Sequence, residues 1–131
     1  MLSGKYLKGI PEDSRANTLP RGKALCYDPF FKGDKAQNTI RILNGLQKVA
    51  EELGSTMARL AVAWTLVYKH VSTAIIGASK PEQIIDNCQA IALLPKLTPE
   101  VLEKIEAIVK NRPKAPRNIK AGFTARLAPV R

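Results

Sequence analysis

The chain has 131 residues, the length of one domain, with 45% hydrophobic and 24% charged side chains and a formal net charge of +10. This composition excludes a disordered chain, whose apolar content would be too low to form a core. No apolar run approaches the roughly 20 residues that cross a bilayer, and Met1 precedes no charged-then-apolar leader pattern, so we expect a cytoplasmic protein without a transmembrane segment.

The first 36 residues predict a long loop. They are rich in Gly, Pro, Asp, Asn and Ser, and they show no sustained helical or strand period. Loops of this length inside a compact domain usually carry function.

Two amphipathic helices are predicted after this loop. Over about residues 37–53 the apolar positions recur at intervals of three and four, and Gly54 follows as a stop. Thr56 predicts the cap of a second helix that ends near residues 69 and 70. The residues assigned to the core are Ile40, Leu43, Leu46, Ala50, Leu53, Leu60, Ala61, Trp64 and Val67.

Residues 71–76 are the one stretch that predicts a strand, because they are rich in β-branched side chains. A lone strand has no ladder, so its backbone groups must be paired by another chain, by missing sequence or by water. The predicted class is therefore α/β, mostly helical with one clear strand, and we expect an incomplete fold.

A third helix is predicted over about residues 80–92, directly after the strand and a turn at Gly77. Ser79 and Glu82 stand three apart and predict a capping box at its start. The side chains assigned to the core are Ile84, Ile85, Cys88 and Ile91.

The start of this helix predicts an anion site. Backbone N–H groups at a helix start are unpaired and carry the positive end of the helix dipole. Gln83 and Asn87 are four apart and share one face with Ser79 and Lys80. The same spacing fits an ordinary helix start with solvated polar groups, and spacing alone supports both interpretations equally.

The last predicted helix begins at Thr98, which is followed by Pro99 and by an acid, Glu100, in the first turn. Its core side chains are Val101, Leu102, Ile105, Ile108 and Val109. Residues 113–131 then predict a basic flexible tail, because they are rich in Pro and contain no acid. The tail has one aromatic residue, Phe123, which argues against specific nucleic-acid binding.

Three blocks resemble the C-terminal part of the aldo-keto reductases, most closely the branch that contains the β subunits of voltage-gated potassium channels. The blocks are Leu2 to Tyr6 with Gly9 to Pro11, Ser14 and Arg15; Leu60 to Trp64; and Ile76 to Ser79 with Glu82, Gln83, Asn87, Ala90, Ile91 and Leu94 to Leu97. We therefore expect residues 1–112 to be the C-terminal part of an NADP-dependent oxidoreductase. Met1 stands where relatives have an internal apolar residue.

The resemblance implies a fragment of a (β/α)₈ TIM barrel that binds NADP(H) at the C-terminal ends of its strands. Residues 71–76 then correspond to the eighth strand. The loop with Lys5 and Arg15 corresponds to the one that folds over the cofactor's pyrophosphate. Ser79, Gln83 and Asn87 resemble residues that hold the adenosine 2′-phosphate and adenine. The candidate cofactor-binding residues are Ser3, Gly4, Lys5, Arg15, Gly77, Ser79, Lys80, Gln83, Asp86 and Asn87.

The resemblance places Asp86 near the adenine amino group and Lys80 beside the 2′-phosphate, which favours NADP(H) over NAD(H). Asp13 departs from the family, since channel-subunit relatives often have an aromatic residue there. An acid at this position would repel the cofactor's phosphates.

The family's catalytic Tyr, Lys, Asp and His lie on its first four strands, and no segment here resembles those that carry them. His70 is interpreted as a partner of the helix dipole. Cys26 and Cys88 lack metal-ligand spacing and predict free thiols and no metal site. We therefore expect a cofactor-binding chain that is inactive alone.

Other functions stay open. The resemblance implies possible assembly as a homotetramer or with a channel α subunit, as part of a redox-sensing regulator. A basic module acting through the tail and a truncated product without activity are two further alternatives.

Overall fold

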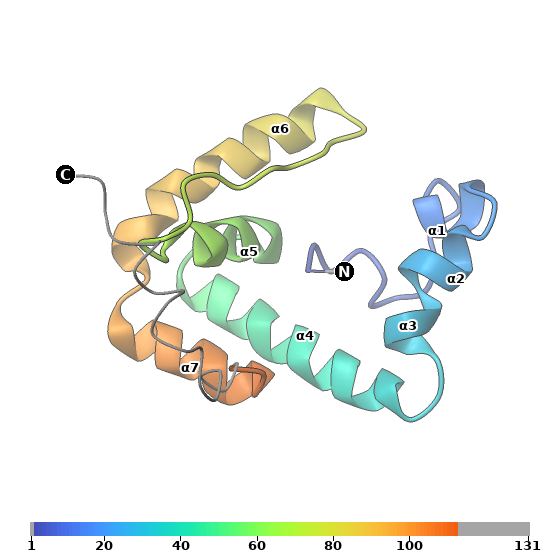
Figure 1. Ribbon diagram of the computed structural model, residues 1–131, viewed down its shortest axis with the longest axis horizontal. Coiled ribbons are helices and arrows are strands. Elements are labelled where there is room, and N and C mark those ends of the chain that lie inside the picture. Colours follow the sequence, from blue (N-terminus) through green and yellow to red (C-terminus); the bar gives the residue numbers. More distant parts are fainter. Residues whose placement is uncertain (1, 113–131) are drawn as a thin grey trace, which may run out of the picture.

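The computed structural model describes residues 2–112, and within that range the chain forms seven α-helices and one 3₁₀ helix. In Figure 1, α4 (Lys35–Glu52) connects the short N-terminal helices to α5 (Met57–Leu66) at the centre of the molecule. Above α5 lies α6 (Pro81–Cys88), and α7 (Pro99–Val109) lies against α4. The basic tail predicted over residues 113–131 is outside the described residues.

The predicted N-terminal loop contains three short helices, so its prediction as irregular throughout is wrong. These are α1 (Arg15–Thr18), α2 (Gly22–Cys26) and α3 (Asp28–Phe31). Elements of four or five residues are too short to show a 3.6-residue apolar period, which explains why the sequence pattern did not reveal them.

An aromatic cluster fastens this N-terminal segment to α3. The ring of Tyr6, whose side chain is buried, meets Tyr27 edge-on with centroids 5.9 Å apart and Phe31 edge-on at 6.3 Å. Tyr27 and Phe31 stack at 4.8 Å. Such geometry is favourable for aromatic pairs, so the cluster holds the segment around Tyr6 in place.

The two helices predicted after the loop are confirmed as α4 and α5. Gly54 adopts a left-handed φ of 67° after α4, and the Thr56 side chain accepts a hydrogen bond of 3.2 Å from the Arg59 N–H. The second helix ends at Leu66, several residues before the predicted end, and His70 is exposed in the turn that follows. Of the predicted core residues, Ile40 is 39% exposed and does not belong to the core.

The strand predicted over residues 71–76 is not formed. Residues 71–78 have no regular secondary structure, and the described part of the chain contains no strand with which they could pair. In Figure 1 this segment runs as a coil between α5 and α6, and Ile75 is 96% exposed. A β-branched sequence favours a strand but does not supply the neighbouring strand that it must pair with, so the described residues contain helices and no strand. The prediction of a mostly helical chain is confirmed, and the prediction of one clear strand is wrong.

We expect the backbone amides of residues 72–78 to exchange with solvent almost as fast as those of an unfolded chain. Among the described residues none of these amides donates a hydrogen bond, whereas the helical amides of α5 do. Hydrogen exchange followed by mass spectrometry on a dilute monomer measures both segments in one experiment. Strong protection of residues 72–78 would show that a segment of the chain pairs with them.

The helix predicted over residues 80–92 divides into α6 and the 3₁₀ helix η1 (Gln89–Lys96). Pro95 lies inside η1, and a proline opposes α-helical continuation by clashing with the carbonyl four residues earlier. The four side chains assigned to the core on this helix are all exposed, which corrects that prediction. They are Ile84, Ile85, Cys88 and Ile91. No described element covers this face, and η1 instead buries Ala90 and Leu93.

The last predicted helix is confirmed as α7, including its cap. The Thr98 side chain accepts a hydrogen bond of 3.5 Å from the Val101 N–H. The hydroxyl of Thr98 and the backbone N–H of Glu100 also hold the pKa of the Glu100 carboxyl below its ordinary value. Ile105 of this helix is fully buried.

The core lies where α4, α5, η1 and α7 meet. Its buried side chains include Leu43, Leu46, Val49, Ala50, Met57, Leu60, Ala63, Ala90, Leu93, Leu97 and Ile105. None of the described helices is long and apolar enough to cross a bilayer. The core therefore fixes α5 and η1, and these two elements carry α6 beside the N-terminal segment.

Candidate functional site

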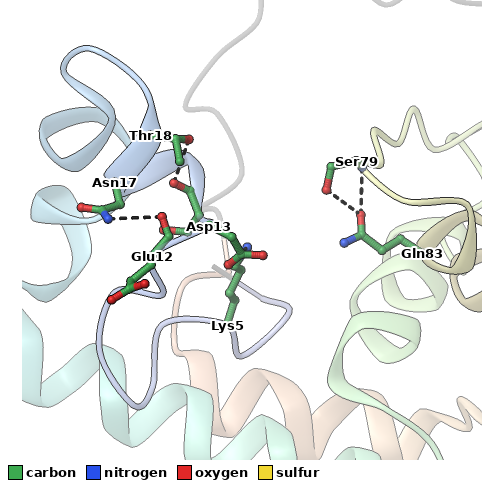
Figure 2. Close-up of polar contacts among 8 residues, drawn as sticks. Lys5, Glu12, Asp13, Asn17, Thr18, Ser79 and Gln83 are labelled. Atoms are coloured by element: carbon green, nitrogen blue, oxygen red, sulfur yellow. Dashed lines mark hydrogen bonds and ion pairs between the residues drawn. The ribbon is translucent and has the colours of Figure 1, made fainter.

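A cavity of about 800 Å³ lies between the N-terminal segment and α6. In Figure 2, Lys5 and Asp13 lie on one side, and Ser79 and Gln83 lie on the other. Eight of the ten predicted site residues line it: Ser3, Lys5, Arg15, Gly77, Ser79, Gln83, Asp86 and Asn87. Gly4 and Lys80 do not line it, although each is adjacent in sequence to residues that do. The structure thus brings together residues 3–15 and residues 77–87, two segments that are distant in the sequence.

The start of α6 forms one wall of the cavity. Lys80 is the residue that precedes the helix, with an extended backbone and no side-chain capping bond. The Ser79 N–H donates to Gln83 Oε1 at 3.0 Å, and the Ser79 hydroxyl lies 3.4 Å from the same oxygen (Figure 2). The predicted capping box between Ser79 and Glu82 is therefore wrong, since Pro81 begins the helix and moves the contact to Gln83.

This contact affects the predicted anion site. The Ser79 N–H, one of the donors expected to face a ligand, is occupied by an oxygen of the chain itself. Pro81 has no N–H to offer. Among the described residues the Lys80 and Glu82 N–H groups donate to no acceptor, so an anion at this helix start can use these two donors, or the Ser79 N–H if it replaces the Gln83 oxygen.

Asp86, on the cavity face of α6, is tied to α5 by an ion pair. Arg59 Nε donates to Asp86 Oδ1 at 2.7 Å, and a second guanidinium nitrogen contacts the same oxygen. Both side chains are about one third exposed or less, so the negative charge of Asp86 is largely compensated. The sequence does not reveal Arg59 as a partner of Asp86, because a contact between residues 27 positions apart depends on how two helices pack.

The opposite wall is the turn that precedes α1. Lys5 Nζ lies 3.7 Å from Asp13 Oδ1, and both residues line the cavity together with Arg15. The Asn17 amide donates to the Glu12 carbonyl at 3.2 Å, and the Thr18 hydroxyl donates to the Ser14 carbonyl at 3.0 Å (Figure 2). These bonds fix the backbone on both sides of Asp13.

Arg15 is held in place by the close approach of α2 to α1. The Gly22 N–H donates to the Leu19 carbonyl at 2.8 Å. A Cβ atom on Gly22 would lie 1.9 Å from the Arg15 carbonyl oxygen, so only glycine fits there without a backbone shift. The position of Arg15 at the cavity therefore depends on the absence of a side chain at Gly22.

Charges of both signs line the cavity. The cations are Lys5 and Arg15, and the acids are Asp13, Glu82 and Asp86. Asp13 is paired with Lys5, which also lines the cavity, and Asp86 is paired with Arg59, which does not. The cavity therefore has polar and cationic donors suited to an anion, together with carboxylates that oppose one.

The remaining candidate residues do not assemble a metal or acid–base centre. Within residues 2–112 no three His, Cys, Asp or Glu side chains gather as metal ligands. Tyr6 lines the cavity, but in this described range no hydrogen bond links its hydroxyl to Lys5 or Asp13. The Tyr68 hydroxyl accepts a bond of 3.2 Å from the Trp64 indole N–H, away from the cavity.

Comparison with known proteins supports the resemblance expected from the three sequence blocks. A model of the Aldo/keto reductase family matches residues 1–110. A probable voltage-gated potassium channel subunit beta from Oryza sativa subsp. japonica is 44% identical over 115 residues, which cover 87% of this chain and 33% of the relative.

Two further relatives are similar. A putative voltage-gated potassium channel subunit beta from Schizosaccharomyces pombe is 42% identical over 113 residues, covering 86% of this chain and 32% of that protein. A probable subunit of the same kind from Arabidopsis thaliana is 40% identical over 119 residues, covering 90% and 34%. The chain thus spans about one third of the length of these relatives.

Proposed function

The chain belongs to the aldo/keto reductase family, and we propose that its cavity holds the adenosine and pyrophosphate groups of NADP(H). The observation that carries this proposal is that eight of the ten candidate residues line one cavity. The cavity volume of about 800 Å³ is typical of a site for a small ligand.

The donor set fits such a cofactor. The hydroxyl of Ser79 and the side-chain amides of Gln83 and Asn87 suit the 2′-phosphate and adenine, while Lys5 and Arg15 suit the pyrophosphate. Lys80 is exposed next to Ser79, from where its flexible side chain can approach a 2′-phosphate. This arrangement favours NADP(H) over NAD(H).

The proposed role of this chain is binding and orientation. When bound, the nicotinamide group supplies a hydride for carbonyl reduction, the activity that family membership suggests for a complete protein. The residues described here hold the far end of the cofactor. We propose that the chain alone does not turn over, because no segment resembles those that carry the family's catalytic residues.

Ser79→Ala and Gln83→Ala are each expected to weaken NADPH binding by about 1–3 kcal/mol, the range for losing a hydrogen bond to a charged or buried partner. Lys80→Ala should weaken NADPH more than NADH, because only NADPH carries the 2′-phosphate. Fluorescence titration of the full chain at fixed salt measures all three variants.

Two matched controls make the same chemical changes outside the cavity. Ser72→Ala and Gln37→Ala alter exposed residues that do not line it, and both should bind NADPH like the parent chain. Unchanged NADPH affinity in both the Ser79 and Gln83 variants would show that the start of α6 does not bind the cofactor. Equal losses of NADPH and NADH in the Lys80 variant would place that side chain against a part that the two cofactors share, and no loss of either would place it in solvent.

A second candidate function is a subunit role in a potassium-channel assembly. It is favoured by the three relatives described as channel β subunits. A homotetramer or a complex with a channel α subunit would be the corresponding partners. Co-purification of the full chain with a channel α subunit tests this candidate, and its absence at micromolar concentrations would argue against it.

A further inference from the structure

Asp13 forms an ion pair with Lys5, and both residues line the cavity. Its carboxylate lies 3.7 Å from the Lys5 ammonium, and Figure 2 shows the pair across the cavity from Ser79 and Gln83. Asp86 differs because its partner, Arg59, does not line the cavity. Any anion that uses Lys5 therefore meets a carboxylate already in place.

The pair is open to exchange. The side chain of Lys5 is 39% exposed and that of Asp13 is 68% exposed. Ion pairs exposed to this degree contribute little and are screened by salt, so water and a ligand can both reach the ammonium. A phosphate group, with more charge and more acceptor oxygens than a carboxylate, can take the place of Asp13.

The backbone, however, keeps Asp13 near Lys5. The Ser14 N–H donates to the Pro11 carbonyl at 3.1 Å, which closes a turn around Asp13. The bonds from Asn17 to Glu12 and from Thr18 to Ser14 brace the same turn. When a ligand displaces the carboxylate, its charge therefore stays close to the site instead of moving away.

We propose that Asp13 is an internal competitor for Lys5 that lowers the affinity of the cavity for phosphate groups. The inference rests on the proposed function, because it takes the anion to be the pyrophosphate of the cofactor. Asp13 is then a specificity-determining residue. Because it weakens binding at Lys5, a ligand binds the cavity only if it also makes further contacts, such as those on α6.

The test is calorimetric titration of the full chain with NADPH and, separately, with inorganic pyrophosphate at low ionic strength. Asp13→Asn should raise the affinity for each probe roughly two- to fivefold, the range that corresponds to an exposed ion pair. The gain should shrink at high salt. Glu12→Gln is the matched control, since it removes the same charge one residue away from a side chain that does not line the cavity, and it should leave both affinities nearly unchanged.

A double-mutant cycle separates competition from simple repulsion. In a Lys5→Gln background the gain from Asp13→Asn should be lost, because there is no ammonium to release. A gain of equal size with and without Lys5, a gain equal to that of Glu12→Gln, or no gain would each overturn the proposal. If no variant binds NADPH but Asp13→Asn still binds pyrophosphate more tightly, the proposed cofactor fails while the competition stands. Binding of neither probe overturns both.

Discussion

Leu60→Ala is expected to lower the free energy of unfolding by about 2–5 kcal/mol. Leu60 is 2% exposed on α5, the helix that contacts α4, α6 and η1. Removing most of its side chain leaves a cavity at the meeting point of these elements, where the packed helices cannot easily close it. Urea denaturation followed by circular dichroism at 222 nm measures the loss.

The control makes the same change at the surface. Leu25 of α2 is 70% exposed, so Leu25→Ala should change the free energy of unfolding by less than about 0.5 kcal/mol. If the two variants lost equal stability, α5 would not be the centre of the core. The wall of the site formed by α6 would then have no firm support.

Gly22→Ala is expected to cost about 1–3 kcal/mol and to weaken binding at the cavity. The added Cβ would lie 1.9 Å from the Arg15 carbonyl oxygen, and a backbone atom cannot rotate aside as a flexible side chain does. Either α2 separates from α1 or the backbone of Arg15 shifts. Thermal unfolding and NADPH titration of the same preparation report the two effects.

Gly33→Ala distinguishes crowding from backbone conformation. A Cβ at Gly33 meets no atom within 4 Å, but the residue has a left-handed φ of 68°, which costs an L-residue about 1–2 kcal/mol. This variant should lose stability and keep its NADPH affinity. If Gly22→Ala also kept its affinity, the contact between α1 and α2 would have no part in positioning Arg15.

The elements that the sequence predicted correctly are those whose signals are local. α4, α5 and α7 are long enough to show an apolar period, and Thr56 and Thr98 supply caps within three residues of the groups they bind. Residues 71–76 failed as a strand because strand formation depends on a partner that local sequence does not contain. The exposed isoleucines of α6 failed as core residues for the same reason.

The candidate site divides in a similar way. Family resemblance selected residues from two distant segments, and most of them line one cavity. The partners of those residues were not predictable. Arg59 reaches Asp86 because two helices pack together, and the bond from Ser79 goes to Gln83 because Pro81 sets where α6 begins.

The aromatic cluster of Tyr6, Tyr27 and Phe31 has a thermodynamic consequence for recognition. Tyr6 follows Lys5 directly, and its buried ring is packed against two others. The segment is therefore ordered when the chain folds, and its conformational entropy is lost then and not when a ligand binds. A ligand meets a preorganised wall, and more of its interaction energy remains available as affinity.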